Sequence, residues 1–185
     1  MTLMLEREVK LRFETPEQAR AAILAAGASP LRCRRFQEDV LLDTEDESLR
    51  QRCCVLRVRT EGGKSLLTYK GPVQTGTMKL RDEYETLVSD GEVLKHVLQE
   101  LGLHVWFRYE KYREEYSAED VTVALDETPV GTFVEIEGGE RGIEAMTQAL
   151  GRTAHDFILD SYRSLFIQHR DEHGWDSVHM VFQEG

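Results

Sequence analysis

The sequence predicts a single α+β domain in which about eight mostly antiparallel strands form a curled sheet, with its charged face inward and helices outside. Three observations predict this class. A chain of 185 residues suffices for one well-buried domain. Short turns separate most of the expected strands, which is typical of antiparallel hairpins. Charged side chains also recur at every second position along most of these strands.

The chain begins with an expected strand followed by a helix. Apolar and charged side chains alternate along residues 3–13, which predicts the strand. A helix is expected over residues 16–26. Thr15 can cap its N-terminus, Pro16 fits its first turn, and Gly27 is a typical stop signal.

Four strands are expected next. Residues 31–43 and 54–60 show the alternation that favours strands. A glycine-containing turn at residues 61–64 then joins the second of these to a strand at 65–70, which predicts a hairpin. Residues 79–88 form a further strand with alternating charges.

A helix over residues 91–101 precedes three more strands. Residues 104–116 read as a long strand, and a short polar turn follows it. Residues 121–126 and 131–137 then form a hairpin around a Thr-Pro turn.

The end of the chain is expected to be helical. Helices are predicted at residues 143–150 and 154–169, with a less regular end after them. Because no linker, repeat or low-complexity segment interrupts the chain, residues 1–185 are expected to form one domain with a helical tail at about 141–185.

Composition excludes some classes of function. The formal net charge is −11, whereas proteins that bind nucleic acid without sequence preference need surplus Lys and Arg. No cationic segment precedes an apolar run at the N-terminus, and no apolar stretch approaches the length of a membrane span. Three cysteines, two of them adjacent, make a poor disulfide framework. We therefore expect a soluble cytoplasmic protein that does not bind membranes and does not bind nucleic acid non-specifically.

The most informative feature is the charged face of the strands. In the first strand Glu6, Glu8 and Lys10 share one side, and apolar residues occupy the other. One such strand is usually a wet surface strand, but the pattern recurs on most of the others. Amphipathic helices need an apolar face to cover, so the charged face must point into the curled sheet. The expected interior acids are Glu6, Glu8, Glu83, Glu85, Asp126, Glu135 and Glu137, and the expected bases are Lys10, Arg57, Arg59, Lys70, Arg81, Lys111 and Arg113.

So many buried charges predict a ligand, because burying ions is costly unless they pair or bind something. Clustered Arg and Lys side chains suit phosphate oxygens. Clustered carboxylates without nearby His or Cys suit hard divalent ions such as Mg²⁺ or Mn²⁺. Together they indicate a polyphosphate and a metal ion in one cavity, as in phosphoryl transfer.

At this point the motifs resemble those of the CYTH, or triphosphate tunnel metalloenzyme, superfamily. Glu6-x-Glu8-x-Lys10 resembles its N-terminal ExExK signature. Further motifs of that family follow in order over nearly the whole chain. They are Leu56-Arg57-Val58-Arg59, Leu67-Thr68-Tyr69-Lys70-Gly71-Pro72, Arg81-Asp82-Glu83-Tyr84-Glu85, Lys111-Tyr112-Arg113, Leu125-Asp126, Gly131-Thr132-Phe133-Val134-Glu135-Ile136-Glu137 and Ser161-Tyr162-x-x-Leu165.

The resemblance implies an eight-stranded antiparallel β-barrel, or tunnel, with Mg²⁺- or Mn²⁺-dependent activity. It implies catalytic roles for Glu6, Glu8, Lys10 and Glu85. The implied metal ligands are Glu6, Glu8, Glu83, Asp126, Glu135 and Glu137. The implied phosphate ligands are Lys10, Arg57, Arg59, Lys70, Arg81, Lys111 and Arg113.

Three functions stay open at this stage. The first is a triphosphatase acting on inorganic triphosphate, thiamine triphosphate or ATP, with a monomer or homodimer expected. The second is a class IV adenylyl cyclase. Leu41 stands where relatives often carry an aromatic residue, and Arg35 precedes Phe36 where such cyclases have a His-Phe pair, which weakens the cyclase interpretation. The third is a polyphosphate- or nucleotide-binding module without turnover, which the many mutually repelling carboxylates disfavour.

Overall fold

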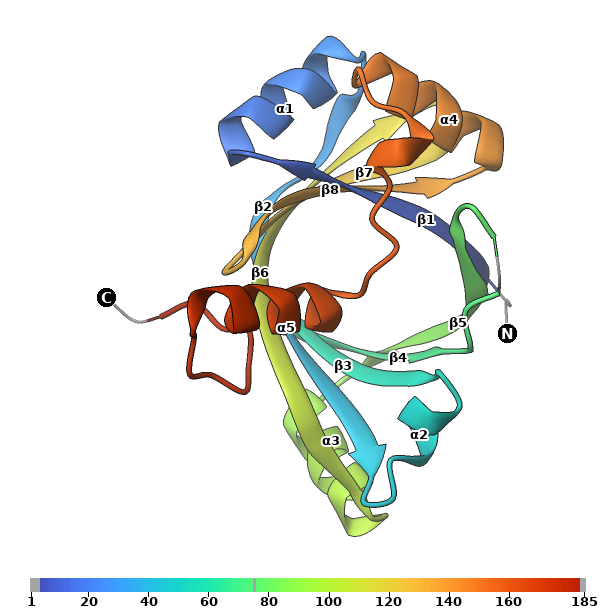
Figure 1. Ribbon diagram of the computed structural model, residues 1–185. Helices are drawn as coiled ribbons and strands as arrows, with labels where there is room; N and C mark the ends of the chain where they lie inside the picture. Colours follow the sequence, from blue (N-terminus) through green and yellow to red (C-terminus); the bar gives the residue numbers. More distant parts are fainter. Residues whose placement is uncertain (1–3, 75, 184–185) are drawn as a thin grey trace.

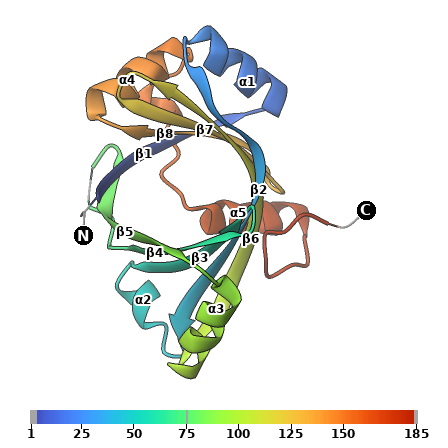
Figure 2. The ribbon, with the colours of Figure 1, turned by 180° about the vertical axis from the view of Figure 1, so that it is seen from behind.

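The computed structural model describes residues 4–74 and 76–183. Its strands form a closed barrel in the spatial order β1-β5-β4-β3-β2-β6-β7-β8, with every neighbouring pair antiparallel (Figure 1 and Figure 2). The strands are β1 (Met4–Phe13), β2 (Ser29–Thr44), β3 (Val55–Glu61), β4 (Lys64–Lys70), β5 (Lys79–Val88), β6 (Leu103–Ala118), β7 (Val121–Thr128) and β8 (Gly131–Gly138). This confirms the predicted eight-stranded antiparallel barrel.

Helices cover the outside of the barrel. They are α1 (Pro16–Ala25), α2 (Ser48–Gln51), α3 (Gly91–Glu100), α4 (Glu140–Ala149), α5 (Tyr162–His173) and a short 3₁₀ turn, η1 (Ala154–Asp156). In Figure 1, α1 and α4 lie above β1, β7 and β8, whereas α3 packs under β3, β4 and β6. The apolar outer face of the sheet is buried under these helices, as in the contact of Val9 and Leu11 with the cluster that holds Ile23 and Ile143.

The charged face of the strands points into the barrel. On β1, Val9 belongs to the apolar core outside the sheet, whereas Glu6, Glu8 and Lys10 on the alternate positions are 5%, 8% and 3% exposed. Strand pairing then places acids beside bases, with Lys10 directly opposite Glu135 on β8. The barrel interior is therefore charged, as the alternation in the sequence predicts.

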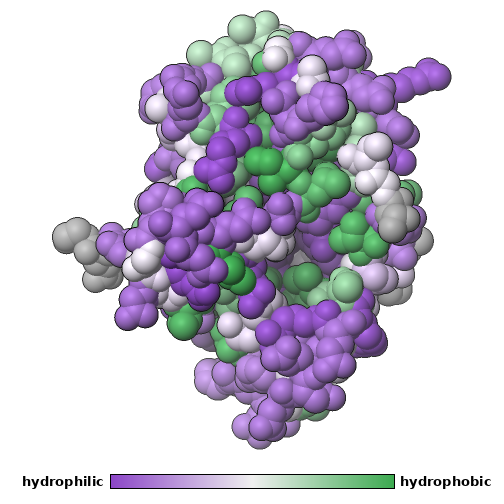
Figure 3. Space-filling view, in the orientation of Figure 1, coloured by the Kyte–Doolittle hydropathy of each residue, from purple (hydrophilic) through white to green (hydrophobic). Residues whose placement is uncertain are grey.

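One end of the barrel is filled by apolar side chains. Leu41, Phe107 and Phe133 from the strands pack against Tyr162 and Phe166 of α5. The segment between η1 and α5 runs across the same opening (Figure 1). On this side of the molecule, hydrophobic residues gather around a hollow in the middle of the face (Figure 3). Because α5 and the segment before it lie at this end, we call the opposite end of the barrel the less covered end.

The continuous helix predicted at residues 154–169 is wrong. The chain forms only one 3₁₀ turn there, closed by a capping box at its start, and then becomes extended. The reason is a long-range backbone contact, since the amide of Ile158 donates to the carbonyl of Lys10 at 2.8 Å. The helix restarts at Tyr162, where the side chain of Ser161 caps it. Local helical periodicity could not reveal this pairing with β1.

Helix α2 was not predicted either. The buried carboxylate of Asp43 accepts hydrogen bonds from the backbone amides of Leu49 and Arg50 at 2.9 and 3.1 Å, and these bonds hold the single helical turn. Strand β2 also begins at Ser29, slightly earlier than expected, and carries bulges. Within residues 4–74 and 76–183, no helix has both the length and the apolar character needed to cross a membrane.

Candidate active site in the barrel interior

Glu6 is the centre of an ion-pair network on β1, β4 and β5. Its side chain lies opposite Arg81 in the strand register, and the Nε of Arg81 donates to its Oε2 at 2.9 Å. Lys70 pairs with the other oxygen of Glu6. The same ammonium group also contacts Glu83 at 2.9 Å. Two bases thus hold two of the predicted metal-binding carboxylates.

Negative charge is in excess around Glu137, and we call Glu6, Glu8, Glu83 and Glu137 the acid-rich region. Lys79 donates to Glu8 at 2.8 Å, but no ion pair involving Glu137 occurs within the described residues. Glu137 is exposed to solvent. Even so, desolvation by the surrounding protein and the nearby Glu6 carboxylate raise its pKa to about 7, and Glu8 and Glu83 contribute in the same direction. A cation bound here would relieve this repulsion.

The opposite imbalance occurs where β6, β7 and β8 meet. Asp126 is fully buried and accepts hydrogen bonds from Lys111 at 2.8 Å and from the Nε of Arg113 at 2.6 Å. Arg113 also pairs with Glu135, which in turn contacts Lys10 at 3.1 Å. We call Lys10, Arg57, Arg59, Lys111 and Arg113 the base-rich region.

Lys111 shows that positive charge is in excess in the base-rich region. The side chain is 1% exposed. Burial and the neighbouring Arg113 lower its pKa to about 8, although Asp126 and Glu135 act in the opposite direction. An anion bound here would favour the charged form of Lys111 and relieve the repulsion.

A buried aspartate that the sequence analysis missed organises the remaining bases. Asp39 on β2 is fully buried and accepts from the Nε of Arg59 at 2.9 Å, and it contacts the Nε of Arg57 at 3.3 Å. Arg57 also donates to Thr68 at 3.2 Å, whose hydroxyl donates to Glu85 at 2.9 Å. Asp39 lies on a strand that the sequence predicts, so the period-two alternation could have placed it inside.

Tyr162 links α5 to the same network. Its hydroxyl donates to Asp126 at 2.6 Å. The ammonium groups of Lys10 and Lys111 lie 4.7 and 4.9 Å from the centre of its ring. Cation–π attraction of this kind favours the charged form of both lysines. The sequence analysis placed Tyr162 in the last of the family motifs, but did not predict this contact with the bases.

The predicted site residues all lie on inward-facing positions of the barrel strands, although they differ in exposure. Most of them are buried, whereas the Glu85 side chain is 38% exposed and lies towards the less covered end. Each base except Lys70 and Arg81 belongs to the base-rich region. Lys70 and Arg81 lie instead against Glu6, in the acid-rich region.

The donor set fits a hard divalent cation, because the acid-rich region offers carboxylate oxygens only. The carboxylates do not yet converge, since no group of three Asp, Glu, His or Cys side chains in the described ranges is arranged to hold a metal ion. Glu6, Glu8 and Glu83 are each turned towards a base. Glu6, Glu8 and Glu137 would be the ligands for such an ion once these ion pairs open.

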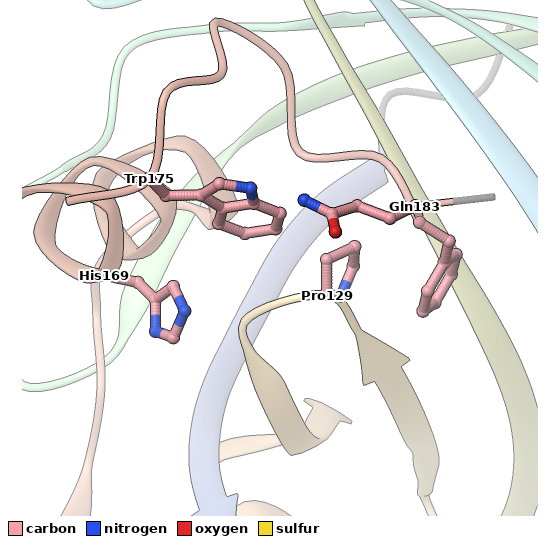
Figure 4. A pocket seen from close by; sticks show the side chains of 5 residues that line it. Pro129, His169, Trp175 and Gln183 are labelled. Carbon is pink, nitrogen blue, oxygen red and sulfur yellow. The ribbon is translucent and has the colours of Figure 1, made fainter. Parts of the chain in front are cut away.

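A separate pocket lies outside the charged interior. It has a volume of about 340 Å³ and lies between α5, the β7–β8 turn and the C-terminal segment (Figure 4). Its lining consists of Pro129, His169, Trp175, Phe182 and Gln183. None of these side chains is a carboxylate, Lys or Arg, so this pocket does not share the chemistry of the barrel interior.

Comparison with known proteins matches this architecture. The family model of the CYTH domain matches residues 4–162. A "Putative adenylate cyclase" of Methanocaldococcus jannaschii is 30% identical over 135 residues, covering 72% of this chain and 77% of that protein. A Pyrococcus horikoshii protein of known structure has a TM-score of 0.73 at 28% identity, covering 86% of this chain and 98% of that one. A Hippeastrum protein, described as a putative adenylyl cyclase with a dominant triphosphatase activity, has a TM-score of 0.68 at 18% identity, covering 88% and 95%. The last likeness shows the fold alone, but the family model spans most of this chain, and the chain therefore belongs to the CYTH domain family.

Proposed function

We propose that this protein hydrolyses a triphosphate inside the barrel with the help of Mg²⁺ or Mn²⁺. One observation carries the proposal, namely that a single interior holds two unbalanced charges of opposite sign. Glu137 has a raised pKa among carboxylates, and Lys111 has a lowered pKa among bases. A complex of a divalent cation with a triphosphate would neutralise both at once.

The roles of the side chains follow from this imbalance. The base-rich region would hold the phosphate oxygens, with the two arginines at Asp39 offering planar bidentate donors. Carboxylates Glu6, Glu8 and Glu137 would hold the metal ion, with Glu83 beside them. A bound divalent ion supplies charge neutralisation of the phosphoryl oxygens and a more acidic bound water. Coordination by Asp126 and Glu135 stays a prediction, since both already accept bonds from bases.

The ion pairs of the interior keep the charged groups in place without a ligand. Lys70 and Arg81 pair with Glu6, and Asp126 pairs with both Lys111 and Arg113. On binding, the bases would exchange a carboxylate for phosphate oxygens, and the carboxylates would exchange a base for the cation. Such an exchange costs less than creating buried charges anew, because their desolvation already accompanies folding.

Water is the expected nucleophile. Hydrolysis needs no pocket for a nucleobase, and positioning with charge neutralisation supplies most of the rate in phosphoryl transfer. Glu85, which is exposed and accepts a bond from Thr68, could orient a water molecule at the less covered end. The dominant triphosphatase activity of the Hippeastrum protein supports the view that this fold suits hydrolysis.

The second candidate is conversion of ATP to cyclic AMP and pyrophosphate. The name of the Methanocaldococcus relative favours it, and that protein is 30% identical to this chain. The same base-rich region could hold ATP so that its 3′-hydroxyl attacks the α-phosphorus. Arg35, where the cyclase pattern has His, forms ion pairs with Glu61 and Glu115 at 2.8 Å each and contributes no base-specific group.

The test is a comparison of products from inorganic triphosphate, thiamine triphosphate and ATP, each with Mg²⁺, Mn²⁺ or a chelator. We expect metal-dependent phosphate release from at least one substrate. A matched pair of variants locates the activity, because Arg59→Gln should abolish it, whereas Arg170→Gln on helix α5, at a partly exposed position, should not. Cyclic AMP as the main product from ATP would favour the second candidate. Absence of both products with every substrate would contradict both.

A further inference from the structure

An apolar step interrupts the charged interior next to Arg59. Strand pairing places Arg59 opposite Leu66 on β4, and Leu66 opposite Leu87 on β5. The neighbouring row contains Thr68 and Glu85, which face inward. Since side chains two residues apart lie on the same face of a strand, Leu66 and Leu87 face inward as well. We call these two residues the leucine pair.

The leucine pair has no packing role in the fold. Leu87 is 70% exposed, and Leu66 is half-buried. Neither belongs to the three apolar clusters of the described residues. The adjacent Leu67 points the other way and packs under α3. Leu66 and Leu87 are paired neighbours that form a small apolar patch on an otherwise charged inner face, and this patch is available for contact with a ligand.

The position of the leucine pair relative to the phosphate-binding arginines indicates which part of a substrate would contact it. It lies one row beyond Arg57 and Thr68, on the side away from the apolar residues Leu41 and Phe107 that fill the end at α5. A triphosphate that contacts Arg57 and Arg59 would therefore have its last phosphate beside the leucine pair. Any group attached to that phosphate would extend towards the less covered end of the barrel.

We propose that the substrate is an organic triphosphate, and that its organic group places an apolar or planar surface on the leucine pair while Arg59 holds the α-phosphate. This inference rests on the proposed function, because it takes the base-rich region as the triphosphate site. The inference goes beyond the proposed function because it distinguishes organic from inorganic triphosphates as substrates. Inorganic triphosphate carries no apolar group that could cover Leu66 or Leu87.

The decisive quantity is the ratio of kcat/KM for an organic triphosphate to kcat/KM for inorganic triphosphate. We would measure it with Mn²⁺ for ATP and thiamine triphosphate in the wild type, Leu87→Ser and Leu101→Ser. Leu101 is the matched control because it is 71% exposed but lies at the end of α3, outside the barrel. Losing an apolar contact in which the ligand partly buries Leu87 predicts a fall in the ratio of about threefold to tenfold in Leu87→Ser.

Three results would overturn the inference. The ratio could stay within about twofold of the wild type in Leu87→Ser, or Leu101→Ser could lower it equally. The wild type could also act on inorganic triphosphate and reject both organic substrates, which would leave the proposed function intact. If no substrate were hydrolysed, the proposed function would fail by itself. Calorimetric Kd values for ATP and inorganic triphosphate in the same proteins would then test the leucine pair, with the same ratio expected to fall in Leu87→Ser.

Discussion

Replacing Asp126 by Asn should destabilise the protein more than any other isosteric change in the barrel. Asp126 is fully buried and accepts from Lys111, from Arg113 and from the hydroxyl of Tyr162. The variant keeps the shape of the side chain but removes its negative charge. Two buried cations then lose their nearest counter-charge. The NH₂ group of Asn would also face the N–H and O–H donors of its neighbours, which cannot accept its hydrogen bonds.

The magnitude follows from these contacts. Removing one partner of a buried ion pair typically costs about 3–5 kcal/mol, because the remaining charge is desolvated without compensation. Glu135 still pairs with Arg113, so the lower part of that range is expected. For a chain of this length a loss of about 3–4 kcal/mol corresponds to a fall in Tm of roughly 6–16 °C.

The pH dependence of the loss provides a second readout. The pKa of Lys111 is already lowered to about 8, and Asp126 is one of the groups that support its charge. In Asp126→Asn the pKa of Lys111 should fall further, so the folded variant binds fewer protons than the unfolded chain and its stability rises with pH. The difference between wild type and variant should therefore narrow as pH rises towards 8, and stay constant above that pH, where Lys111 is neutral in both folded proteins.

Urea denaturation at pH 7 and at pH 9 measures both effects. Asp171→Asn is the control, because Asp171 is exposed and forms a surface ion pair with Arg170, for which less than about 1 kcal/mol is expected. A loss of less than about 1 kcal/mol in Asp126→Asn would refute the view that this carboxylate holds the bases in place. A loss that widened above pH 8 would refute the assigned role of Lys111.

Three further predictions concern the same network. Because the pKa of Glu137 is raised from 4.5 to about 7, the wild type should lose stability relative to Glu137→Gln as pH rises from about 4.5 to 7. Mn²⁺ should cancel this difference in stability. Curves of Tm against pH that ran parallel for the two proteins would contradict the crowding of carboxylates around Glu137. Tyr162→Phe keeps the ring beside Lys10 but removes the hydrogen bond to Asp126. The free energy of unfolding should therefore fall by about 1.5–3 kcal/mol. A loss below about 0.5 kcal/mol would show that this hydrogen bond contributes little to stability. Triphosphate binding at pH 8–9 should be accompanied by uptake of a proton at Lys111. Calorimetry in buffers of different ionisation enthalpy measures this uptake. The variant Lys111→Arg should abolish it, because Arg stays charged.

Much of the barrel could be predicted because alternation along a strand is a local property. Glu6, Glu8 and Lys10 read as one face in the sequence, and that face points inward. The alternation did not predict, however, which acid pairs with which base across the strands. The partner of Glu6 is Lys70 together with Arg81, a pairing that depends on β5 lying beside β1.

The part that the sequence did not predict depends on contacts between distant segments. The expected helix at residues 154–169 is interrupted because Ile158 pairs with the backbone of Lys10, which lies at the other end of the chain. The alternation along its strand could have placed Asp39 inside, but its partners Arg57 and Arg59 follow only from the pairing of β2 with β3. The opposite imbalances at the two regions also emerge only when the barrel closes.

The central claim is that the interior exchanges its ion pairs for a triphosphate and a divalent cation. A crystal structure with Mn²⁺ and a non-hydrolysable triphosphate analogue, with an anomalous map at the manganese edge, tests it most directly. The account predicts an anomalous peak among Glu6, Glu8 and Glu137, phosphate oxygens on Arg57 and Arg59, and an open Glu6–Lys70 pair. A ligand outside the barrel, with the Glu6–Lys70 and Lys111–Asp126 pairs intact, would contradict it.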